Sequence, residues 1–336
     1  MPAWSGSSVR AAAVSLRSTK MAATLSTRGL SSAAKGQLSP GAKIGVVGMG
    51  LMGHGIAQLA ADKAGFQVVA LDKNPQAMEK GVKAIENSLS KVYSKKLKDA
   101  DSSEVSKKVE SIMGQIQGTS DINDLKGCEI VVEAIIENLD IKKSFYKELG
   151  QVCDADTVLA SNTSSFPIGH LAEASGRPDK VVGLHFFNPV QMMNLCEVVK
   201  AKDTSDATFD IGMDFANKVQ RFPVKCKDTP GFVVNRLLVP YLAQALTMYD
   251  RGEASTKDID EAMMRGAGHP MGPFHLADYI GHDTIHSIIS GWKDMFPDEP
   301  AFIMPKCLEE LVAEGKLGRK SGQGFYKWEG NKVIKE

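Results

Sequence analysis

The stretch KIGVVGMGLMGHGIAQLAADKAGFQVVALD, residues 43–72, decides the fold. Its first six residues form a β-branched run that is typical of a buried strand. Residues 51–65 have the apolar spacing of a helix that ends at Gly65, and residues 67–72 are again typical of a buried strand. A strand, a glycine-rich turn, a helix and a second strand in this order predict the βαβ unit of a parallel sheet.

The turn after the first strand holds Gly48, Gly50 and Gly53 in the spacing G-x-G-x-x-G. The first glycine permits a tight turn, the second lets the backbone approach a pyrophosphate, and the third allows close helix–strand packing. Amide groups at the helix start then point toward the phosphates. We therefore predict that this turn binds a dinucleotide, with Leu51 and Met52 among the contacting residues.

Asp72 ends the second strand, 19 residues after Gly53. A carboxylate at this point accepts hydrogen bonds from the adenosine ribose hydroxyls and repels a 2′-phosphate. This favours NAD over NADP as the cofactor. Lys73 is the one neighbour that argues the other way, because an ammonium group attracts phosphate.

Strands and helices continue to alternate as far as about residue 227. Strands are expected at 128–136, 156–162, 181–187, 194–201 and 222–227, and helices at 75–97, 103–113, 138–152 and after residue 205. The alternation predicts an α/β Rossmann-type N-terminal domain over residues 41–229, with a mostly parallel, doubly wound sheet covered on both faces.

The segment KDTPGF, residues 227–232, marks the predicted domain boundary. Thr229 can cap a helix and Pro230 suits its first position, so we expect a helix from there to about Arg251. That helix is apolar nearly all round, which indicates burial in a domain or in a dimer interface. The pattern beyond it is helical almost to the end and predicts an all-α C-terminal domain over residues 230–336.

Composition excludes several classes of protein. The 336 residues are 43% apolar and 24% charged, with zero formal net charge, so no basic field attracts nucleic acid. Glu133, Glu137, Asn235 and Arg236 interrupt the longest apolar runs, and we expect no membrane span. The five cysteines are odd in number and lack C-x-x-C spacing, which argues against a disulfide framework or zinc ribbon.

The N-terminal segment differs from the rest in charge. Residues 1–61 contain no Asp or Glu, and five basic residues lie within the first 36 among Ser, Ala, Thr and Leu. This is typical of a mitochondrial or chloroplast transit peptide, which we assign to residues 1–40. A disordered basic tail is the alternative.

The run GLHFFNP, residues 183–189, places His185 between two strand-like stretches, and Glu197 lies in the second of them. A hairpin centred on Gln191 would put His185 opposite Glu197, within reach of a carboxylate–imidazole hydrogen bond. A histidine beside phenylalanines is often a packed core residue. A histidine held by a carboxylate is instead suited to removing a proton from an alcohol.

Other polar residues have two interpretations each. The run SNTSS, residues 161–165, is either a helix cap or a ligand loop at a strand end. Asn188 precedes a proline and can open a turn, while Asn235, within the predicted apolar helix, needs either a structural or a substrate partner. His282 and His286 lack the further ligands of a metal site, and no metal is expected.

Four lysines, at positions 91, 95, 96 and 98, cluster on the helix after the second strand. They form either a solvated helix face or a docking patch for an anionic carrier.

The chain resembles the short-chain L-3-hydroxyacyl-CoA dehydrogenases of mitochondrial fatty-acid β-oxidation from about Lys43 to Trp328. The resemblance includes VGMGLMGHGIAQ, VVEAIIENLDIKK, ASNTSS, GLHFFNPV, CKDTPGFVVNRLLVPYL, GHPMGPFHLADYIG and GRKSGQGFYKW. It implies NAD-dependent oxidation of (S)-3-hydroxyacyl-CoA to 3-oxoacyl-CoA in the mitochondrial matrix.

The resemblance also implies roles for individual residues. His185 would be the general base and Glu197 its partner. Ser164 and Asn235 would bind the substrate oxygen, with Ser164 also near the cofactor. Asn188 would help to place the nicotinamide and the histidine.

Further positions match ligand contacts of the family. Glu137, Lys142 and Lys320 match cofactor contacts, and Ser88 and Lys95 match coenzyme A contacts. The family implies a homodimer joined through the C-terminal domain. His54 departs from the family, which more usually has a small residue in this turn.

Two other functions remain open at this point. The λ-crystallin and L-gulonate dehydrogenase group shares the Rossmann and HFFNP features, and an inactive structural or NAD-sensing protein is a further alternative. The presence of both His185 and Glu197 argues against inactivity. The lysine cluster and the transit segment argue against a cytosolic sugar-acid enzyme.

The acid-free N-terminus generates a first prediction. The mature protein should begin between about residues 20 and 41, because matrix targeting segments of this composition are removed after import. N-terminal sequencing of protein purified from the organelle measures this. An intact Met1 or Pro2 would contradict the targeting assignment.

Overall fold

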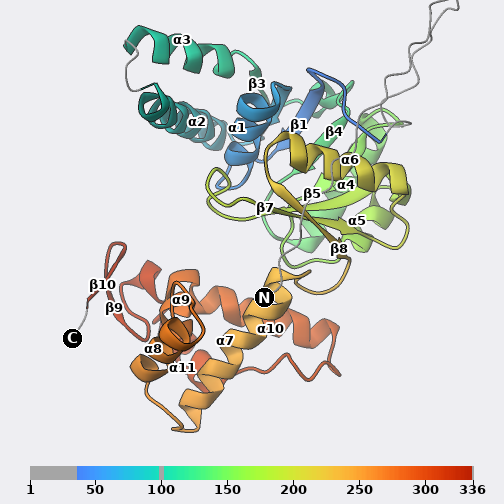
Figure 1. Ribbon diagram of the computed structural model, residues 1–336. Coiled ribbons are helices and arrows are strands. Elements are labelled where there is room, and N and C mark those ends of the chain that lie inside the picture. The colour runs from blue at the N-terminus through green and yellow to red at the C-terminus, as the bar shows by residue number, and fades with distance from the viewer. Residues whose placement is uncertain (1–35, 98–101, 335–336) are drawn as a thin grey trace, which may run out of the picture. The chain divides into compact units, whose positions relative to one another are not determined.

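The computed structural model describes residues 36–97 and 102–334 (Figure 1). The predicted transit segment, up to residue 35, and Lys98 lie outside the described residues. An eight-stranded sheet forms the first part of the chain, in the order β3-β2-β1-β4-β5-β6-β7-β8. Its strands are β1 (Lys43–Val47), β2 (Gln67–Leu71), β3 (Ile116–Thr119), β4 (Ile130–Glu133), β5 (Val158–Ser161), β6 (Val181–Phe186), β7 (Leu195–Lys200) and β8 (Phe222–Lys227).

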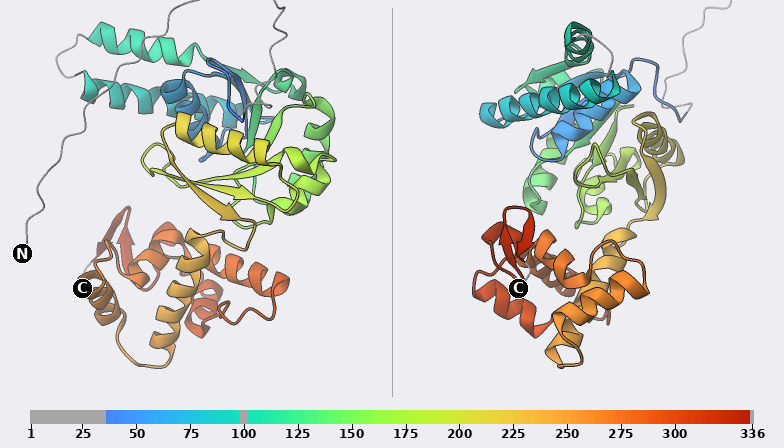
Figure 2. Two further views of the ribbon diagram at one scale, coloured as in Figure 1. Left: turned by 45° about the vertical axis from the view of Figure 1, so that its right-hand side comes forward. Right: turned by 60° about the vertical axis from the view of Figure 1, so that its left-hand side comes forward.

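Helices cover both faces of this sheet. They are α1 (Gly53–Ala64), α2 (Pro75–Lys96), α3 (Ser102–Met113), α4 (Leu139–Val152), α5 (Ile168–Ala174) and α6 (Asp206–Lys218). One apolar cluster joins α1, α2 and α6 to the sheet, and a second joins α4 and α5 to it. Figure 2 shows the green helices α4 and α5 on the side of the sheet opposite the yellow α6.

Alternation along the strands explains the two clusters. In β1, Ile44 and Val46 pack with the α1 cluster, whereas Val47 packs with the α4 cluster. Successive side chains of a strand point to opposite faces, so a strand with helices on both sides is apolar throughout. The predicted α/β Rossmann-type fold with a mostly parallel sheet is confirmed.

Two features of the sheet order set up a ligand site. Strand β1 lies between β2 and β4, so the connections from β1 and β4 lead to opposite sides of the sheet. Ligands of doubly wound sheets bind at the carboxyl ends of the strands at such a point. Farther along, β6 and β7 pair antiparallel, and the register puts His185 opposite Glu197 as the hairpin spacing predicted.

The second part of the chain is helical. It contains α7 (Val234–Asp250), α8 (Thr256–Gly266), α9 (Pro273–Ile280), α10 (His282–Met295) and α11 (Lys306–Ala313). Leu242, Leu246, Phe274 and Trp292 lie in its apolar core. A short ribbon of β9 (Lys327–Glu329) and β10 (Lys332–Ile334), which the helical pattern did not predict, follows these helices.

The predicted start of α7 is wrong. The helix begins at Val234, after a turn in which Gly231 has φ 72° and Phe232 has φ 53°. A right-handed helix cannot pass through two left-handed residues, so Thr229 and Pro230 do not act as its cap and first residue. Val233 precedes the helix without a side-chain cap.

Smaller departures concern short elements. Strand β3 was not predicted, because its four residues are only half-buried or exposed and show no alternation. The predicted strand at 128–136 is reduced to β4, since its pairing with β1 and β5 ends at Glu133. Within the described ranges, no helix is both long and apolar enough to cross a membrane.

The corrected turn generates a stability prediction. A Cβ on Gly231 would lie 2.4 Å from the Trp292 ring, whereas a Cβ on Gly252, which has φ 69°, would meet nothing within 4 Å. Both Gly→Ala variants incur left-handed strain of about 1–2 kcal/mol. Gly231→Ala should lose roughly a further 1–3 kcal/mol of unfolding free energy through overpacking, measured by denaturant titration. Equal losses would contradict close packing of the turn on Trp292.

Candidate active site

The three glycines of the turn differ in the space around them. Gly48 has φ 88°, and a Cβ there would lie 2.6 Å from the carbonyl oxygen of Ala134. A Cβ on Gly53 would lie 1.7 Å from the carbonyl oxygen of Gly48. A Cβ on Gly50 would meet nothing within 4 Å, so this backbone is open to a ligand. The turn therefore fits a bound pyrophosphate.

Three further residues of the turn differ in exposure. Leu51 is 66% exposed and Met52 is half-buried. His54 is half-buried, and its Nδ1 lies 2.7 Å from the carbonyl oxygen of Gly50. Because the carbonyl accepts, Nδ1 carries the proton and the ring braces the turn.

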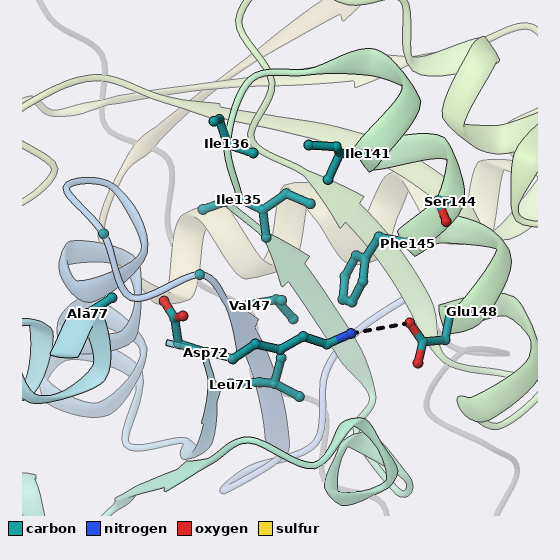
Figure 3. A pocket seen from close by; sticks show the side chains of 14 residues that line it. Val47, Leu71, Asp72, Ala77, Ile135, Ile136, Ile141, Ser144, Phe145 and Glu148 are labelled. Atoms are coloured by element: carbon teal, nitrogen blue, oxygen red, sulfur yellow. Dashed lines mark ion pairs between the residues drawn. The ribbon is translucent and has the colours of Figure 1, made fainter. Parts of the chain in front are cut away.

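A pocket of about 520 Å³ lies beside the turn, at the carboxyl ends of β1, β2 and β4. Figure 3 shows Asp72 and Ala77 on one side, and Ile141 and Phe145 on the other. Apolar walls with a few polar groups suit a flat adenine ring joined to a ribose. The Asp72 oxygens accept hydrogen bonds of 2.8 Å from the amides of Met49 and Asn74, which hold the carboxylate at this edge.

The positive charge of Lys73, which argued against a preference for NAD, is partly neutralised. Lys73 Nζ lies 3.8 Å from Glu148 Oε2 in the same pocket, as the dashed line in Figure 3 marks. Both side chains are largely exposed, so the pair is worth at most about 1 kcal/mol. Glu148, from α4, was not singled out from the sequence, because nothing in the spacing relates it to Lys73.

His185 and Glu197 form the buried pair of the site. His185 Nδ1 lies 2.7 Å from Glu197 Oε2, and the two residues are 5% and 0% exposed. The other carboxylate oxygen, Oε1, accepts hydrogen bonds from the amides of Val233 at 3.0 Å and Val234 at 2.8 Å. The ring of Phe187 flanks the imidazole, with centroids 4.4 Å apart.

These contacts set the tautomer of the imidazole. An ionised carboxylate only accepts hydrogen bonds, so Nδ1 of His185 must donate to Glu197. The lone pair of the neutral ring is then on Nε2. This arrangement leaves Nε2 able to receive a proton from a bound alcohol, with the charge that forms stabilised by Glu197.

The loop after β5 is held by Glu137. Its Oε1 accepts from Thr163 Oγ1 at 2.6 Å, from the amide of Ser164 at 3.0 Å and from the amide of Ser165 at 3.2 Å. Ser164 Oγ is 3.4 Å from the same oxygen. Glu137 and Ser164, two of the predicted site residues, are thus brought together.

Lys142 is buried beneath this loop. It is 1% exposed, and its Nζ lies 3.2 Å from Glu137 Oε2 and 2.6 Å from Glu133 Oε1. Glu133 was noted in the sequence only as an interruption of an apolar run. Asn162 also received no role, yet its Oδ1 accepts a 2.9 Å hydrogen bond from the amide of Phe186 and so ties the Ser164 loop to the His185 strand.

Three further predicted residues, in the described part of the chain, make no direct contact with the His185–Glu197 pair. Asn188 is exposed just after β6, before a cis bond to Pro189. Asn235 lies inside helix α7 as predicted, half-buried in its first turn directly after Val234. Lys320, in the helical part of the chain, forms an ion pair with Asp283.

The proposed carrier contacts lie on α2. Ser88 is half-buried and Lys95 is exposed, two helical turns apart on one face, with exposed Lys91 between them. Lys96 instead lies over the Tyr93 ring, 5.4 Å from its centroid.

The cysteines and the histidine pair take no part in this site. All five cysteines are buried and free, and burial raises the pKa of Cys128 to about 12 and that of Cys153 to about 11, which keeps both thiols protonated. His282 Nδ1 is 2.7 Å from the carbonyl oxygen of Lys316. In the described part of the chain, no group of three or more His, Cys, Asp or Glu residues is arranged to hold a metal ion.

Comparison with protein families identifies the group. Residues 43–229 match the model of the 3-hydroxyacyl-CoA dehydrogenase NAD binding domain, and residues 231–328 match that of the C-terminal domain of the same enzymes. The chain belongs to the 3-hydroxyacyl-CoA dehydrogenase family. It is an NAD-dependent enzyme of this family, and NAD is its cofactor.

Individual relatives agree with this assignment. The chain is 48% identical to the mitochondrial hydroxyacyl-coenzyme A dehydrogenase of Sus scrofa over 84% of this chain and 90% of the relative. It is 46% identical to a probable 3-hydroxyacyl-CoA dehydrogenase of Caenorhabditis elegans over 91% and 98%. The crystal structure of (S)-3-hydroxybutyryl-CoA dehydrogenase from Ralstonia eutropha is similar, with a TM-score of 0.80, 37% identity and coverage of 85% and 99%.

The pocket generates a prediction on cofactor choice. Asp72→Ala should weaken NAD binding by about 1.5–3 kcal/mol and reduce discrimination against NADP, because a hydrogen bond to a charged group is lost. Glu148→Gln, which frees Lys73, should leave NAD affinity unchanged and strengthen NADP binding by no more than about fivefold. Fluorescence titration with NADH and NADPH measures both. Unchanged NADH affinity in Asp72→Ala would remove the ribose assignment.

Proposed function

We propose that this dehydrogenase oxidises (S)-3-hydroxyacyl-CoA to 3-oxoacyl-CoA in fatty-acid β-oxidation, with His185 as general base. The observation that carries the proposal is the 2.7 Å contact between His185 Nδ1 and Glu197 Oε2, which leaves Nε2 as a base. The relatives named as 3-hydroxyacyl- and 3-hydroxybutyryl-CoA dehydrogenases support the substrate class.

The chemistry divides between base and cofactor. His185 Nε2 takes the proton of the substrate 3-hydroxyl group as the C3–H bond breaks and the carbonyl forms. NAD, when bound, would supply the acceptor for the hydride that leaves C3. Glu197 stabilises the imidazolium that results, because an opposite charge within hydrogen-bond distance favours the protonated ring. The proton later leaves the imidazolium to solvent, which restores the base.

Substrate placement would fall to two side chains. Ser164, on the loop held by Glu137, and Asn235, in the first turn of α7, would donate hydrogen bonds to the substrate oxygen. Asn188 would help to place the nicotinamide beside His185. Glu137, Lys142 and Lys320 would complete the cofactor contacts.

The α2 face would bind the carrier. Ser88 and Lys95 would contact coenzyme A, whose phosphates are attracted by exposed ammonium groups. Such contacts persist from ground state to transition state, so they lower KM and contribute little to kcat.

We also propose a homodimer through the C-terminal domain, residues 230–336, with residues 41–229 as the cofactor domain. Several large apolar side chains of α7 and α8 are exposed in the single chain, with Leu237 at 69%, Tyr249 at 41% and Met264 at 38%. Exposed apolar groups on a helical surface favour association.

The location proposed is the mitochondrial matrix, with residues 1–40 as the transit peptide. The mammalian relatives named mitochondrial support it. The test of substrate class is NADH formation with 3-hydroxyacyl-CoAs of several chain lengths, set against L-gulonate. Turnover of the acyl-CoA esters alone is expected. Turnover of L-gulonate alone would overturn the proposal in favour of the sugar-acid group.

The His185–Glu197 pair generates a kinetic prediction. His185→Gln should lower kcat by about 10²–10⁴ with NAD affinity nearly intact, because a general base is lost. In Glu197→Gln the amide oxygen can still accept from Val233 and Val234, but the NH₂ group then faces Nδ1. Nδ1 must become the acceptor, Nε2 carries the proton, and kcat should fall by a similar factor.

A double variant tests whether His185 and Glu197 act as one unit or independently. His185→Gln/Glu197→Gln should have a kcat little below that of His185→Gln, since residues that act as one unit are not additive. His286→Gln, a half-buried histidine of α10, is the matched control and should keep wild-type kcat. Losses that multiply in the double variant would mean that the two residues act separately.

A further inference from the structure

Glu133 is a buried carboxylate to which neither the reaction nor the cofactor gives a role. It ends β4 and is 0% exposed. Its Oε1 accepts hydrogen bonds from Lys142 Nζ at 2.6 Å and the amide of Ile135 at 2.8 Å, and its Oε2 accepts one of 2.8 Å from Ser161 Oγ. Ser161 ends the neighbouring strand, β5, and pairs with Glu133 in register. Burial prevents Glu133 from touching cofactor or substrate.

Lys142 carries the influence of Glu133 outward. Its ammonium group is buried and lies between two carboxylates, Glu133 on the inner side and Glu137, 3.2 Å away, on the outer side. A buried ammonium group requires a carboxylate partner. A buried carboxylate at hydrogen-bond distance binds it more strongly than a partly exposed carboxylate does. The stronger contact is with Glu133.

Glu137 then passes this placement to the loop that carries Ser164. One of its oxygens faces Lys142, and the other accepts hydrogen bonds from Thr163, Ser164 and Ser165. From the end of β4 to the loop, the charged groups in contact are therefore Glu133, Lys142 and Glu137, which alternate in sign. Direct contacts thus connect Glu133 to the amide of Ser164 through Lys142 and Glu137.

We propose that Glu133 is a positioning residue for the dehydrogenase reaction, acting through Lys142 and Glu137 on the Ser164 loop. The proposal rests on the proposed function, because it assumes that Ser164 and Glu137 contact substrate or cofactor. Without the charge of Glu133, the ammonium group of Lys142 has Glu137 as its one carboxylate partner and draws it inward. Glu137 then releases the amides of Ser164 and Ser165.

The test compares Glu133→Gln with the corresponding variant of a buried carboxylate that also accepts several hydrogen bonds but lies away from the Ser164 loop. Asp260, on α8, is 6% exposed and accepts from the amides of Phe274 and His275 and from Tyr326 Oη. Glu133→Gln and Asp260→Asn should both lower Tm. Only Glu133→Gln should also lower kcat for a 3-hydroxyacyl-CoA, by about 10- to 100-fold, because a misplaced loop loses the reactive geometry.

A double variant tests the route through Lys142. The kcat of Glu133→Gln/Lys142→Met should be no lower than that of Lys142→Met alone, since Glu133 acts through that ammonium group. If Glu133→Gln does not fold, Glu133→Asp replaces it in the comparison. The shorter side chain keeps the charge and draws Lys142 toward β4, so kcat should fall as expected for Glu133→Gln.

Failure of the positioning role can be distinguished from failure of the proposed function. If the wild type turns over no 3-hydroxyacyl-CoA, the proposed function fails. If the wild type is active and the folded Glu133 variants keep its kcat, the positioning role is overturned. Losses that multiply in the Glu133→Gln/Lys142→Met variant also overturn it, because the two residues would then act independently.

Discussion

The carboxylate of Glu197 is fully buried, and three donors share it: the imidazole of His185 and the amides of Val233 and Val234. An ionised carboxylate without partners in such a place would cost several kcal/mol. Three hydrogen bonds offset that cost and fix the carboxylate in one orientation. The imidazole next to it is then fixed as well, with Nδ1 inward and Nε2 free.

This constraint reaches beyond the β6–β7 hairpin. The amides of Val233 and Val234 come from the start of α7, directly after the left-handed turn at Gly231 and Phe232. Both amides reach Glu197 directly after this turn. Asn235 follows immediately, in the first turn of α7. The backbone next to Asn235, which is proposed to bind the substrate oxygen, is thus hydrogen-bonded to the carboxylate that holds His185.

The sequence predicts those features that depend on local spacing. The glycine turn, Asp72 and the register of His185 with Glu197 follow from residue intervals, because a turn of given length determines which side chains of a hairpin face each other. Gly231 is different, since its left-handed turn packs closely on Trp292, far along the chain, and local spacing does not reveal that contact. Local capping rules therefore predicted a helix start four residues too early.

Buried charge pairs are also beyond local rules. Periodicity indicates that Glu133 and Lys142 lie on elements that pack together, but it does not reveal that their side chains meet inside the protein. The edge strand β3 was not predicted, because its side chains are too exposed to show an alternating pattern. The roles of Ser164, Asn188, Asn235 and Lys320 stay predictions that the family resemblance supplies.

Through its hydrogen bond, Glu197 holds His185 in the tautomer protonated at Nδ1. Nitrogen-15 NMR of the labelled enzyme, at a pH where the imidazole is neutral, measures this directly. The signals of His185 are assigned among the seven histidines by their loss in His185→Gln. We expect a protonated Nδ1 and an unprotonated Nε2. A proton on Nε2 with a bare Nδ1 would contradict it, since the nitrogen left to face the substrate could not then act as a base.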